Sequence, residues 1–466
     1  MPSFDPAQLA AWTGGRWTTT PVSPLSGFTQ DTRVLRPGQV FVALKTGKRD
    51  GHEFLGAAQA VGAGAALVAK ADAALALPQL VVADPLAAFQ AIAREHRRAF
   101  QGPVIGISGS AGKTSTKNLL AVLLGGDAAG VLATEGNLNN FIGVPLTLTQ
   151  LDPARHHFAV IEAGISEPGE MATLAAMIQP DVALVTLVGP AHTQELGGVD
   201  GVAYEKSRLP AAVRAHGIAM FPRQCAAFPS FRDLAVRTLV VEPAEVLRPA
   251  EPPKDRVYFT LTQRGGETAI ALAYGPPPPL VFTLRRVTDG MAQNAVLAIC
   301  AALWLGVSRE TIQQRLGAWT PAQLRGEIRQ VAGKMLYLDC YNANPASMTD
   351  ALEAFYALAP ADQPRLYVLG GMEELGPEAP RYHYELGRGL RLRSQDRVFV
   401  IGGEAGMVRR GALDAGATEA QVAVVTSLGP VAADLAAFRG AVFVKGSRKY
   451  QLENVLAAEP SAHAAH

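Results

Sequence analysis

The sequence predicts an α/β protein built from three consecutive α/β domains. Short apolar runs typical of buried strands recur along the chain, and helical stretches separate them. A chain of 466 residues is also too long for one ordinary hydrophobic core. We therefore expect an N-terminal domain over residues 1–100, a central domain over residues 101–320 with a mostly parallel sheet of the P-loop type, and a C-terminal Rossmann-like domain over residues 321–466.

The expected strands and helices follow one another in the order that such domains require. In the first domain they are strands at 40–44 and 65–69 and a helix over 86–100. In the central domain they are strands at 103–108, 158–164 and 181–188, helices over 114–124 and 294–306, and a more antiparallel segment from about 220 to 285 with strands at 257–262 and 268–274. In the third domain they are strands at 335–341, 365–371, 397–403 and 441–447, with helical segments between them.

Composition and charge exclude several classes of protein. The net charge is +1, so no overall field favours nucleic acid or an anionic membrane. Cys225, Cys300 and Cys340 are far apart and indicate neither a disulfide framework nor a zinc site. The first residues, MPSFDPAQLAAW, lack the segments of a signal peptide, and no apolar run reaches the roughly 18 residues of a membrane span. We expect a cytoplasmic protein without membrane insertion.

The stretch GISGSAGKTSTKNLL (106–120) resembles a phosphate-binding loop between a strand and a helix. A strict P-loop has a glycine where Ile107 stands. Gly109 and Gly112 nevertheless allow the sharp turn that directs backbone N–H groups at an anion. Lys113 would lie on the β- and γ-phosphates of a nucleotide, and the hydroxyl of Thr114 would bind Mg²⁺. The alternative is an ordinary glycine turn before a helix.

Two further residues are expected near this loop. Glu162 ends one predicted strand and His192 follows another, so both would lie at the carboxyl edge of a parallel sheet. An acid and an imidazole at that edge favour a metal–phosphate site. Taken singly, Glu162 could be a surface acid and His192 a loop histidine.

Several stretches together resemble the Mur ligases of peptidoglycan synthesis, and the similarity covers nearly the whole chain. They are GISGSAGKTSTK, TEGNLNNFIGVPLTL (134–148), IEAGISEPGEM (161–171), AHTQELG (191–197), DCYNANPASM (339–348), LGGMEELG (369–376) and VKGSR (444–448). The resemblance is strongest to the branch that adds D-alanyl-D-alanine to UDP-N-acetylmuramoyl-tripeptide. It implies an ATP-dependent amide ligase that forms ADP and phosphate, acts through an acyl phosphate, uses two Mg²⁺ ions and is a monomer.

The resemblance also implies roles for individual residues. Those implied in catalysis are Lys113, Lys206 and His192, and those implied in holding metal are Thr114, Glu162, His192 and Lys206, the last as a CO₂-derived carbamate. Those implied in ATP binding are Gly109, Ser110, Ala111, Gly112, Lys113, Thr114, Ser115, Asn294, Asp339 and Asn342. Those implied in binding the UDP-linked substrate are Asp31, Thr32, Arg33, Asp50, Gly51, His52, Asn137, Asn139 and Asn140. Those implied in binding the amino substrate are Tyr341, Asn344, His383 and Lys445.

The residues alone are also compatible with ordinary structural roles. Lys206 reads as a lysine on a helix surface, and the DTR, DGH, NLNN and YNANP segments read as polar turns or loops. The chain also departs from the family pattern. Gly290 stands where a histidine is usual, Ala163 replaces methionine, Gly371 replaces aspartate and Thr32 replaces serine. A sister amide ligase, or an ATP-driven switch or assembly protein, remains as an alternative function.

Overall fold

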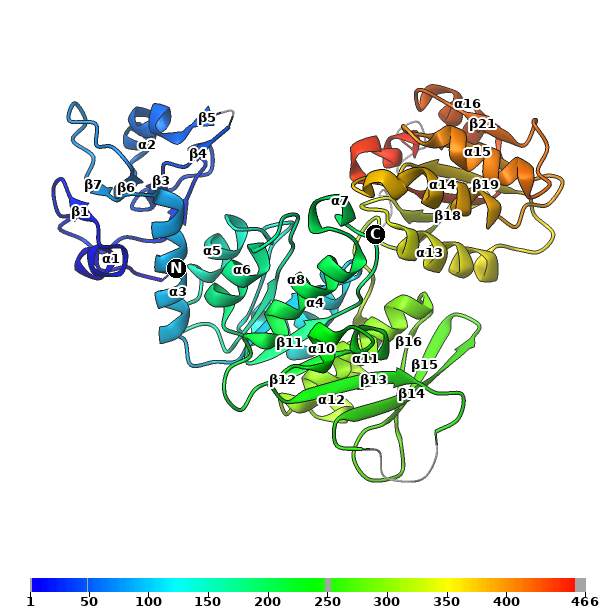
Figure 1. Cartoon of the computed structure of the whole chain (residues 1–466), viewed down its shortest axis with the longest axis horizontal. Coiled ribbons are helices and arrows are strands. Elements are labelled where there is room, and N and C mark those ends of the chain that lie inside the picture. The colour runs from blue at the N-terminus through cyan, green and yellow to red at the C-terminus, as the bar shows by residue number, and fades with distance from the viewer. Residues whose placement is uncertain (1, 48, 248–252, 457–466) are drawn as a thin grey trace.

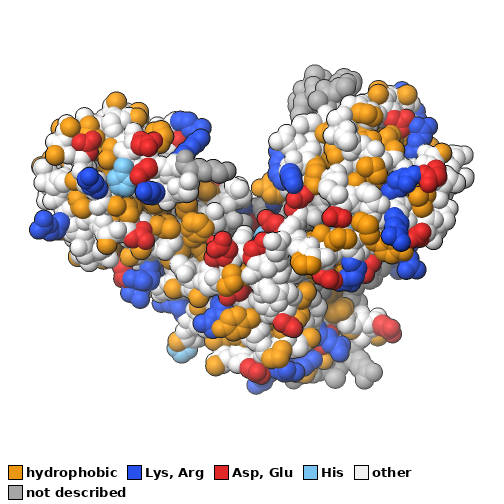
Figure 2. Space-filling model, turned by 45° about the horizontal axis from the view of Figure 1, so that its top comes forward, with side chains coloured by type: hydrophobic (Ala, Val, Ile, Leu, Met, Phe, Trp, Pro, Cys, Tyr) orange, Lys and Arg blue, Asp and Glu red, His pale blue; other side chains and the backbone are white. Residues whose placement is uncertain are grey.

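The computed structural model describes residues 2–47, 49–247 and 253–456 of the chain. Three α/β bodies follow one another, each built on its own sheet, which confirms the predicted fold class. The N-terminal and C-terminal bodies stand on opposite sides of the central one (Figure 1). Figure 2 shows the surface hollowed between them, above the central body.

The N-terminal body has a five-stranded sheet of order β1-β7-β6-β3-β2, parallel except for β1. Its elements are α1 (Pro6–Thr13), β1 (Arg16–Trp17), β2 (Phe28–Thr29), β3 (Val40–Val42), β4 (Lys45–Thr46), β5 (Arg49–Asp50), η1 (Gly51–Phe54), α2 (Leu55–Val61), β6 (Ala65–Val68), β7 (Gln79–Val81) and α3 (Pro85–Ala99). Helix α3 begins where Asp84 accepts hydrogen bonds from the backbone N–H groups of Leu86 and Ala87.

Helix α3 also connects the N-terminal body to the central one (Figure 1). The side chain of Arg97, only 1% exposed, donates from Nε to the carbonyl of Ile178 at 2.9 Å. It pairs through Nη2 with Asp181 at 2.9 Å. Nearer the start of the helix, Gln90 donates to the carbonyl of Phe141 at 3.0 Å. The first body is therefore attached to the second along a helix, by buried as well as exposed contacts.

The central body has a nine-stranded sheet of order β16-β15-β14-β13-β12-β11-β8-β10-β9. Its strands are β8 (Val104–Ser108), β9 (Val131–Ala133), β10 (Phe158–Glu162), β11 (Val182–Val185), β12 (Ile218–Pro222), β13 (Thr238–Pro243), β14 (Arg256–Arg264), β15 (Glu267–Ala273) and β16 (Leu280–Arg285). Its helices are α4 (Lys113–Leu124), η2 (Asp127–Ala129), α5 (Gly143–Leu148), α6 (Glu170–Ile178), α7 (Thr193–Leu196), α8 (Val199–Ala211), α9 (Arg223–Ala226), α10 (Pro229–Arg232), α11 (Asp289–Trp304) and α12 (Arg309–Ala318).

The antiparallel segment expected over about 220–285 is only partly right. Strands β14, β15 and β16 pair antiparallel, but β12 and β13 extend the parallel part of the sheet as far as β14. The apolar runs at 218–222 and 239–241 are buried on both sides, and a run of that kind is typical of a parallel strand.

Helices α4 and α11 fix the position of the glycine loop. Leu119, Leu120 and Leu123 of α4 are fully buried in the same core as the sheet and the apolar helix α11. Residues of α11 from Ala295 to Ala302 are all buried, as expected for a helix covered on every side. The loop is thus held between strand β8 and a helix that cannot shift without opening the core.

The C-terminal body has a six-stranded sheet of order β17-β18-β22-β19-β20-β21, parallel except for β17. Its elements are β17 (Glu327–Val331), β18 (Lys334–Asp339), α13 (Pro345–Leu358), β19 (Arg365–Gly370), η3 (Gly376–Glu378), α14 (Ala379–Arg388), β20 (Arg397–Ile401), α15 (Ala405–Asp414), β21 (Val422–Val424), α16 (Gly429–Ala437), β22 (Gly440–Lys445), η4 (Arg448–Tyr450) and η5 (Leu452–Leu456). In the described part of the chain, no helix is both long and apolar enough to cross a membrane.

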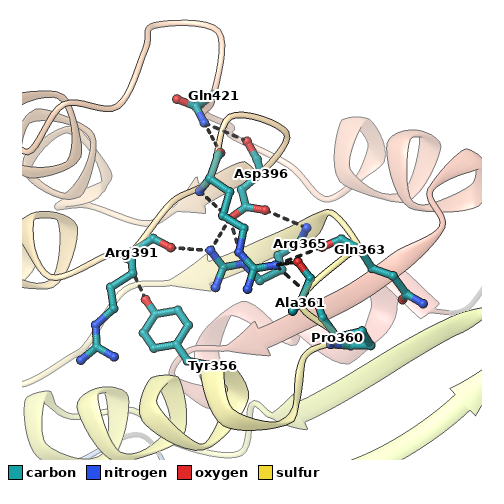
Figure 3. A network of polar contacts seen from close by, with 9 residues as sticks. Tyr356, Pro360, Ala361, Gln363, Arg365, Arg391, Asp396 and Gln421 are labelled. Carbon is teal, nitrogen blue, oxygen red and sulfur yellow. Dashed lines mark hydrogen bonds and ion pairs between the residues drawn. The ribbon is translucent and has the colours of Figure 1, made fainter.

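A buried ion pair lies where two neighbouring strands of this third sheet begin (Figure 3). Arg365, at the start of β19, donates from Nε and Nη2 to Asp396 at 2.8 and 2.6 Å. Both residues are at most 3% exposed. The backbone N–H groups of Arg365 and Arg393 donate to the same carboxylate. The pair joins the beginning of β19 to the loop that precedes β20.

Candidate active site

The glycine loop has the backbone geometry expected of an anion site. Gly109 has φ 145° and Gly112 has φ 78°, both in the region that favours glycine. A Cβ at Gly109 would lie 1.9 Å from Oγ1 of Thr186, and a Cβ at Gly112 would lie 2.3 Å from Nδ2 of Asn294. Only glycine fits either position. The loop leads directly into α4, whose positive N-terminal end faces the same space.

Lys113 is the first residue of α4. Its Nζ donates to the carbonyl of Gly109 at 2.9 Å, which folds the side chain back over the loop. Desolvation lowers the pKa of Lys113, and the cation of Arg325 lowers it further, whereas Glu162 raises it. An anionic phosphate would restore the missing counter-charge, so the position suits a phosphate ligand.

Glu162 and Thr114 form the part of the site that fits a hard cation. Oγ1 of Thr114 donates to Oε1 of Glu162 at 3.2 Å, and Nδ2 of Asn139 donates to the same oxygen at 2.8 Å. Glu162 is 2% exposed, so the surface alternative is wrong. Its Oε2 is buried without a hydrogen-bond partner among the described residues, and Nζ of Lys117 is 4.0 Å away. A buried carboxylate oxygen beside a hydroxyl fits Mg²⁺.

His192 pairs with a residue of the C-terminal body, and Lys206 is buried in the central one. Nδ1 of His192 makes an ion pair of 2.6 Å with Glu374 of the C-terminal body. Lys206 is 1% exposed, so the alternative of a lysine on a helix surface is wrong. Burial lowers the pKa of Lys206 well below its ordinary value, and Lys113 lowers it further. Among the described residues, no three His, Cys, Asp or Glu side chains form a metal-binding group.

The C-terminal body contributes a second polar surface opposite the loop. Asn344 caps α13 and donates from Nδ2 to the carbonyl of Ser110 at 3.1 Å. Nζ of the buried Lys445 donates to Oδ2 of Asp339 at 2.5 Å and to the carbonyl of Asn342 at 3.2 Å. The polar turn after β18 therefore faces the phosphate loop across a domain boundary.

A cavity of about 370 Å³ lies between these two surfaces. The predicted residues that line it are Ser110, Ala111, Gly112, Lys113, Thr114, Ser115, Asn137, Asn139, Glu162, Asn294, Asp339, Tyr341, Asn342, Asn344 and Lys445. The lining does not include Gly109, His192 or Lys206. Asn140 is not in the lining either; it lies just before α5, where its Oδ1 accepts from the N–H groups of Ile142 and Gly143.

A second cavity, of about 710 Å³, lies in the N-terminal body and reaches Phe141 and Ile142 of the central one. Asp50 and His52 line it and form an ion pair at 2.6 Å. Asp31, Thr32 and Arg33 are not in its lining. Instead, Arg33 binds Asp31 at 2.6 Å and lowers the pKa of that carboxyl to about 2.

His383 lies apart from the other residues expected at the amino-substrate site. Its ring is buried, accepts at Nε2 from the N–H of Met372 at 2.9 Å and contacts the carbonyl of Ala379 through Nδ1 at 2.7 Å. It lines a third cavity with Glu373, Glu374 and Tyr450.

Three residues that the motifs did not indicate also belong to the site. Arg325 lines the first cavity and stacks on the ring of Tyr341 at 4.0 Å from its centroid. Lys117 is buried one turn after Lys113 and faces Glu162. Asp350 lines the cavity from α13. Lys117 follows Lys113 by four residues and so lies on the same helix face, and this spacing could have predicted Lys117 as a site residue. Arg325 and Asp350 reach the site only through packing between domains.

The fold and the site define the class of protein. Models of the Mur ligase middle domain and of the "Mur ligase, glutamate ligase domain" match residues 107–302 and 324–448. The chain belongs to the Mur ligase family, whose members are ATP-dependent ligases.

Individual relatives narrow the comparison. The chain is 32% identical to UDP-N-acetylmuramoyl-tripeptide--D-alanyl-D-alanine ligase of Escherichia coli (strain K12), with 93% of each protein covered. It is similar to a crystal structure of MurF from Acinetobacter baumannii, with a TM-score of 0.87, 28% identity and 98% of each chain covered. It is also similar to the Thermotoga maritima MurF ligase in complex with ADP, with a TM-score of 0.76, 27% identity and coverage of 92% of this chain and 96% of that one.

Proposed function

We propose that this enzyme uses ATP to join D-alanyl-D-alanine to UDP-N-acetylmuramoyl-tripeptide, in the cytoplasm and as a monomer. The observation that carries the proposal is the cavity between the phosphate loop and the turn after β18. One wall presents Lys113 and the N-terminus of α4, and the other presents Asp339, Asn342 and Lys445. A site divided in this way can hold a nucleotide on one body and receive a second substrate from the other. Residues 341–344 of the branch-specific YNANP segment lie in that second wall.

The chemistry requires activation of a carboxylate, because joining it to an amine in water is unfavourable. In the proposed reaction, the terminal carboxylate of the tripeptide attacks the γ-phosphate of ATP, and ADP leaves as an acyl phosphate forms. The amine of D-alanyl-D-alanine then attacks the acyl carbon, and inorganic phosphate leaves. Lys113 and the N–H groups of the loop would offset the charge that gathers on the transferred phosphoryl group. The two walls would hold the reactants in line and exclude water from the acyl phosphate.

Thr114 and Glu162 would hold Mg²⁺, with Asn139 orienting the carboxylate. Bound there, the ion would supply charge neutralisation at the phosphates. His192 would join this set after its pairing with Glu374 breaks, because that pairing holds its ring against the C-terminal body.

We also propose that Lys206 carries a carbamate. The ammonium first loses one proton; the uncharged amine then attacks CO₂, a C–N bond forms as one C=O π bond opens, and a second proton leaves, so a cationic side chain becomes an anionic one. Burial and the neighbouring Lys113 both lower the pKa of Lys206, which supports the uncharged form that this reaction needs. A negative carbamate would also relieve the repulsion between the two lysines.

The second cavity is the proposed site for the uridine diphosphate part of the substrate. Lys45, Lys70 and His52 lie around it and could offset diphosphate charge. Asp31, Thr32 and Arg33 lie outside its lining, so a role for them would require the substrate to extend beyond the cavity.

A coupled assay of ADP release tests the proposed function. We expect ADP to form at a sustained rate only when the UDP-linked tripeptide and D-alanyl-D-alanine are both present. A sister ligase would require another amino substrate in place of the dipeptide. ATP turnover that is indifferent to both substrates would contradict the proposal and favour an ATP-driven switch.

A further inference from the structure

The cavity beside the phosphate loop has a second, mostly apolar end. Val287, Met291, Ala354 and Leu358 line it, from the start of α11 and from α13 of the C-terminal body. Apolar walls about a narrow space suit the faces of a nucleobase, and the phosphate loop lies at the other end. A nucleotide that places its phosphates on Lys113 would therefore direct its base toward this end.

Asp350 places a carboxylate among these apolar residues. Its Oδ1 accepts a hydrogen bond of 2.9 Å from the backbone N–H of Gly290. A Cβ at position 290 would lie 2.6 Å from its Oδ2, so the glycine leaves the space that the carboxylate fills. Among the charged side chains of the cavity lining, Asp350 is the one carried by α13, beside Ala354 and Leu358. The side chain of Thr288 also hydrogen-bonds the carboxylate of Asp350.

Asn294 offers a second acceptor on the same face of α11. It follows Gly290 by four residues, which places the two positions one above the other on the helix. Asn294 is 6% exposed, and its Oδ1 is buried without a hydrogen-bond partner among the described residues. Asn294 and Asp350 thus both line the cavity with acceptor oxygens, Asn294 from α11 and Asp350 from α13.

We propose that Asp350 is a base-specificity residue, which together with Asn294 accepts hydrogen bonds from the exocyclic amino group of adenine. This inference rests on the proposed use of ATP at the loop. An amino group carries two N–H donors and satisfies both oxygens at once. A 6-oxo purine presents another acceptor at that position, which leaves the buried Oδ1 of Asn294 unpaired and places an oxygen against the carboxylate of Asp350, and sites of this kind reject such analogues strongly.

The charge state of the carboxyl group affects how well it discriminates between the two bases. Burial raises the pKa of Asp350, and the charges of Asp289 and Asp339 raise it further, whereas hydrogen bonds from Thr288 and Gly290 lower it. A protonated carboxyl retains a carbonyl oxygen that accepts from an amino group. Its O–H would however donate to a 6-oxo group, so selectivity for adenine depends on the ionised carboxylate.

Asp350 also caps the start of α11 through Gly290, and the test must separate this structural role from base recognition. Asp350→Asn can keep the acceptor for Gly290 while it presents an NH₂ donor to the base. Asp350→Ala removes both contacts. Asp289→Asn is the matched control, because Asp289 is the neighbouring acid at the start of α11 and does not line the cavity.

The experiment compares kcat/KM for ATP with kcat/KM for inosine triphosphate, which has an oxo group in place of the amino group. We expect Asp350→Asn to reduce the preference for ATP by about 10-fold or more, partly through a gain with inosine triphosphate. We expect Asp350→Ala to reduce the preference by loss with ATP alone, and Asp289→Asn to leave it unchanged. If both Asp350 variants lower the two rates in equal proportion, Asp350 is only a helix cap and the proposal is overturned.

Binding of ADP and inosine diphosphate, measured by titration calorimetry, gives the same ratio without peptide substrates. It remains informative if a variant is catalytically dead and if the proposed amide-forming function is wrong. An unchanged ADP to inosine diphosphate ratio of Kd values in folded Asp350→Asn would overturn the proposal on its own.

Discussion

The buried pair of Arg365 and Asp396 gives a sharp prediction about stability (Figure 3). Asp396→Asn keeps the shape of the side chain and removes the charge. Asp396 is 1% exposed, and its two oxygens accept four hydrogen bonds, three from Arg365 and one from the N–H of Arg393. The substitution leaves the guanidinium of Arg365 buried without a counter-charge. We expect a loss of about 3–5 kcal/mol in the free energy of unfolding of the C-terminal body.

A loss of that size corresponds to a fall of about 10 °C in the melting temperature of a domain of this length. The four tryptophans of the chain, Trp12, Trp17, Trp304 and Trp319, all precede β17, so tryptophan fluorescence does not report on this body. Scanning calorimetry, together with amide hydrogen exchange of peptides covering β19 and β20, does. Faster exchange should be confined to the third body.

Asp434→Asn is the matched control, because Asp434 pairs with Arg397 on the surface of the same body. The side chain of Arg397 is 55% exposed, and we expect a loss below about 1 kcal/mol. Equal losses in the free energy of unfolding for the two substitutions would refute the reasoning that burial determines how much an ion pair contributes to stability.

Four further predictions concern the site. Lys113→Ala should abolish ATP-dependent turnover, because it removes the ammonium that folds back over the loop, and ADP release measures this. Lys206→Ala should lose activity and regain part of it when short carboxylic acids replace the proposed carbamate. Glu374→Gln should free His192 and lower the Mg²⁺ concentration for half-maximal activity by up to about 5-fold, the value of an exposed ion pair. Burial lowers the pKa of His383 below its ordinary 6.5, so on acidification the unfolded chain takes up a proton before the folded chain does. The contribution of the neutral His383 ring to the free energy of unfolding is present above pH 6.5 and should decline as the pH falls below that value.

Each of these predictions has an outcome that contradicts it. Substantial turnover by Lys113→Ala, or full activity of Lys206→Ala without additives, would remove the proposed roles of these lysines. A higher Mg²⁺ requirement in Glu374→Gln would mean that Glu374 assists the reaction. For His383, urea unfolding of the wild type and of His383→Gln should diverge less at pH 5.5 than at pH 7.5, and the reverse order would be inconsistent with a buried neutral ring.

The sequence predicted the parts of the fold that depend on local pattern. Strands β3, β6, β8, β10, β11, β14, β15, β18, β19, β20 and β22 all lie within or overlap the apolar runs identified from the sequence. The glycine loop was also predicted correctly, because Gly109 and Gly112 impose their geometry locally. Strands β12 and β13 were assigned to an antiparallel segment because the pairing partner of a buried strand is not encoded in the strand itself. The domain limits at residues 100 and 320 stay predictions.

The site was less predictable where it depends on packing between bodies. The burial of Lys206 follows from the way α8 packs on the central sheet, and a single lysine in a polar stretch carries no sign of it. His192 was expected beside Glu162, but its ring is turned to Glu374 because the C-terminal body lies against α7. Asp350 and Arg325 had no motif to identify them. Their positions are set by contacts between domains that are distant in sequence.

The attachment through Arg97 has a consequence for how the molecule can change shape. The first body is joined to the second by a buried guanidinium and a continuous helix, whereas the third touches the second mainly through side chains such as Asn344, Asp350 and Glu374. We therefore expect the first two bodies to move together as one rigid unit and the third body to move relative to them. Distances measured between spectroscopic labels on the first and second bodies should then stay constant throughout turnover. Distances from either of these bodies to a label on the third should alternate between two values.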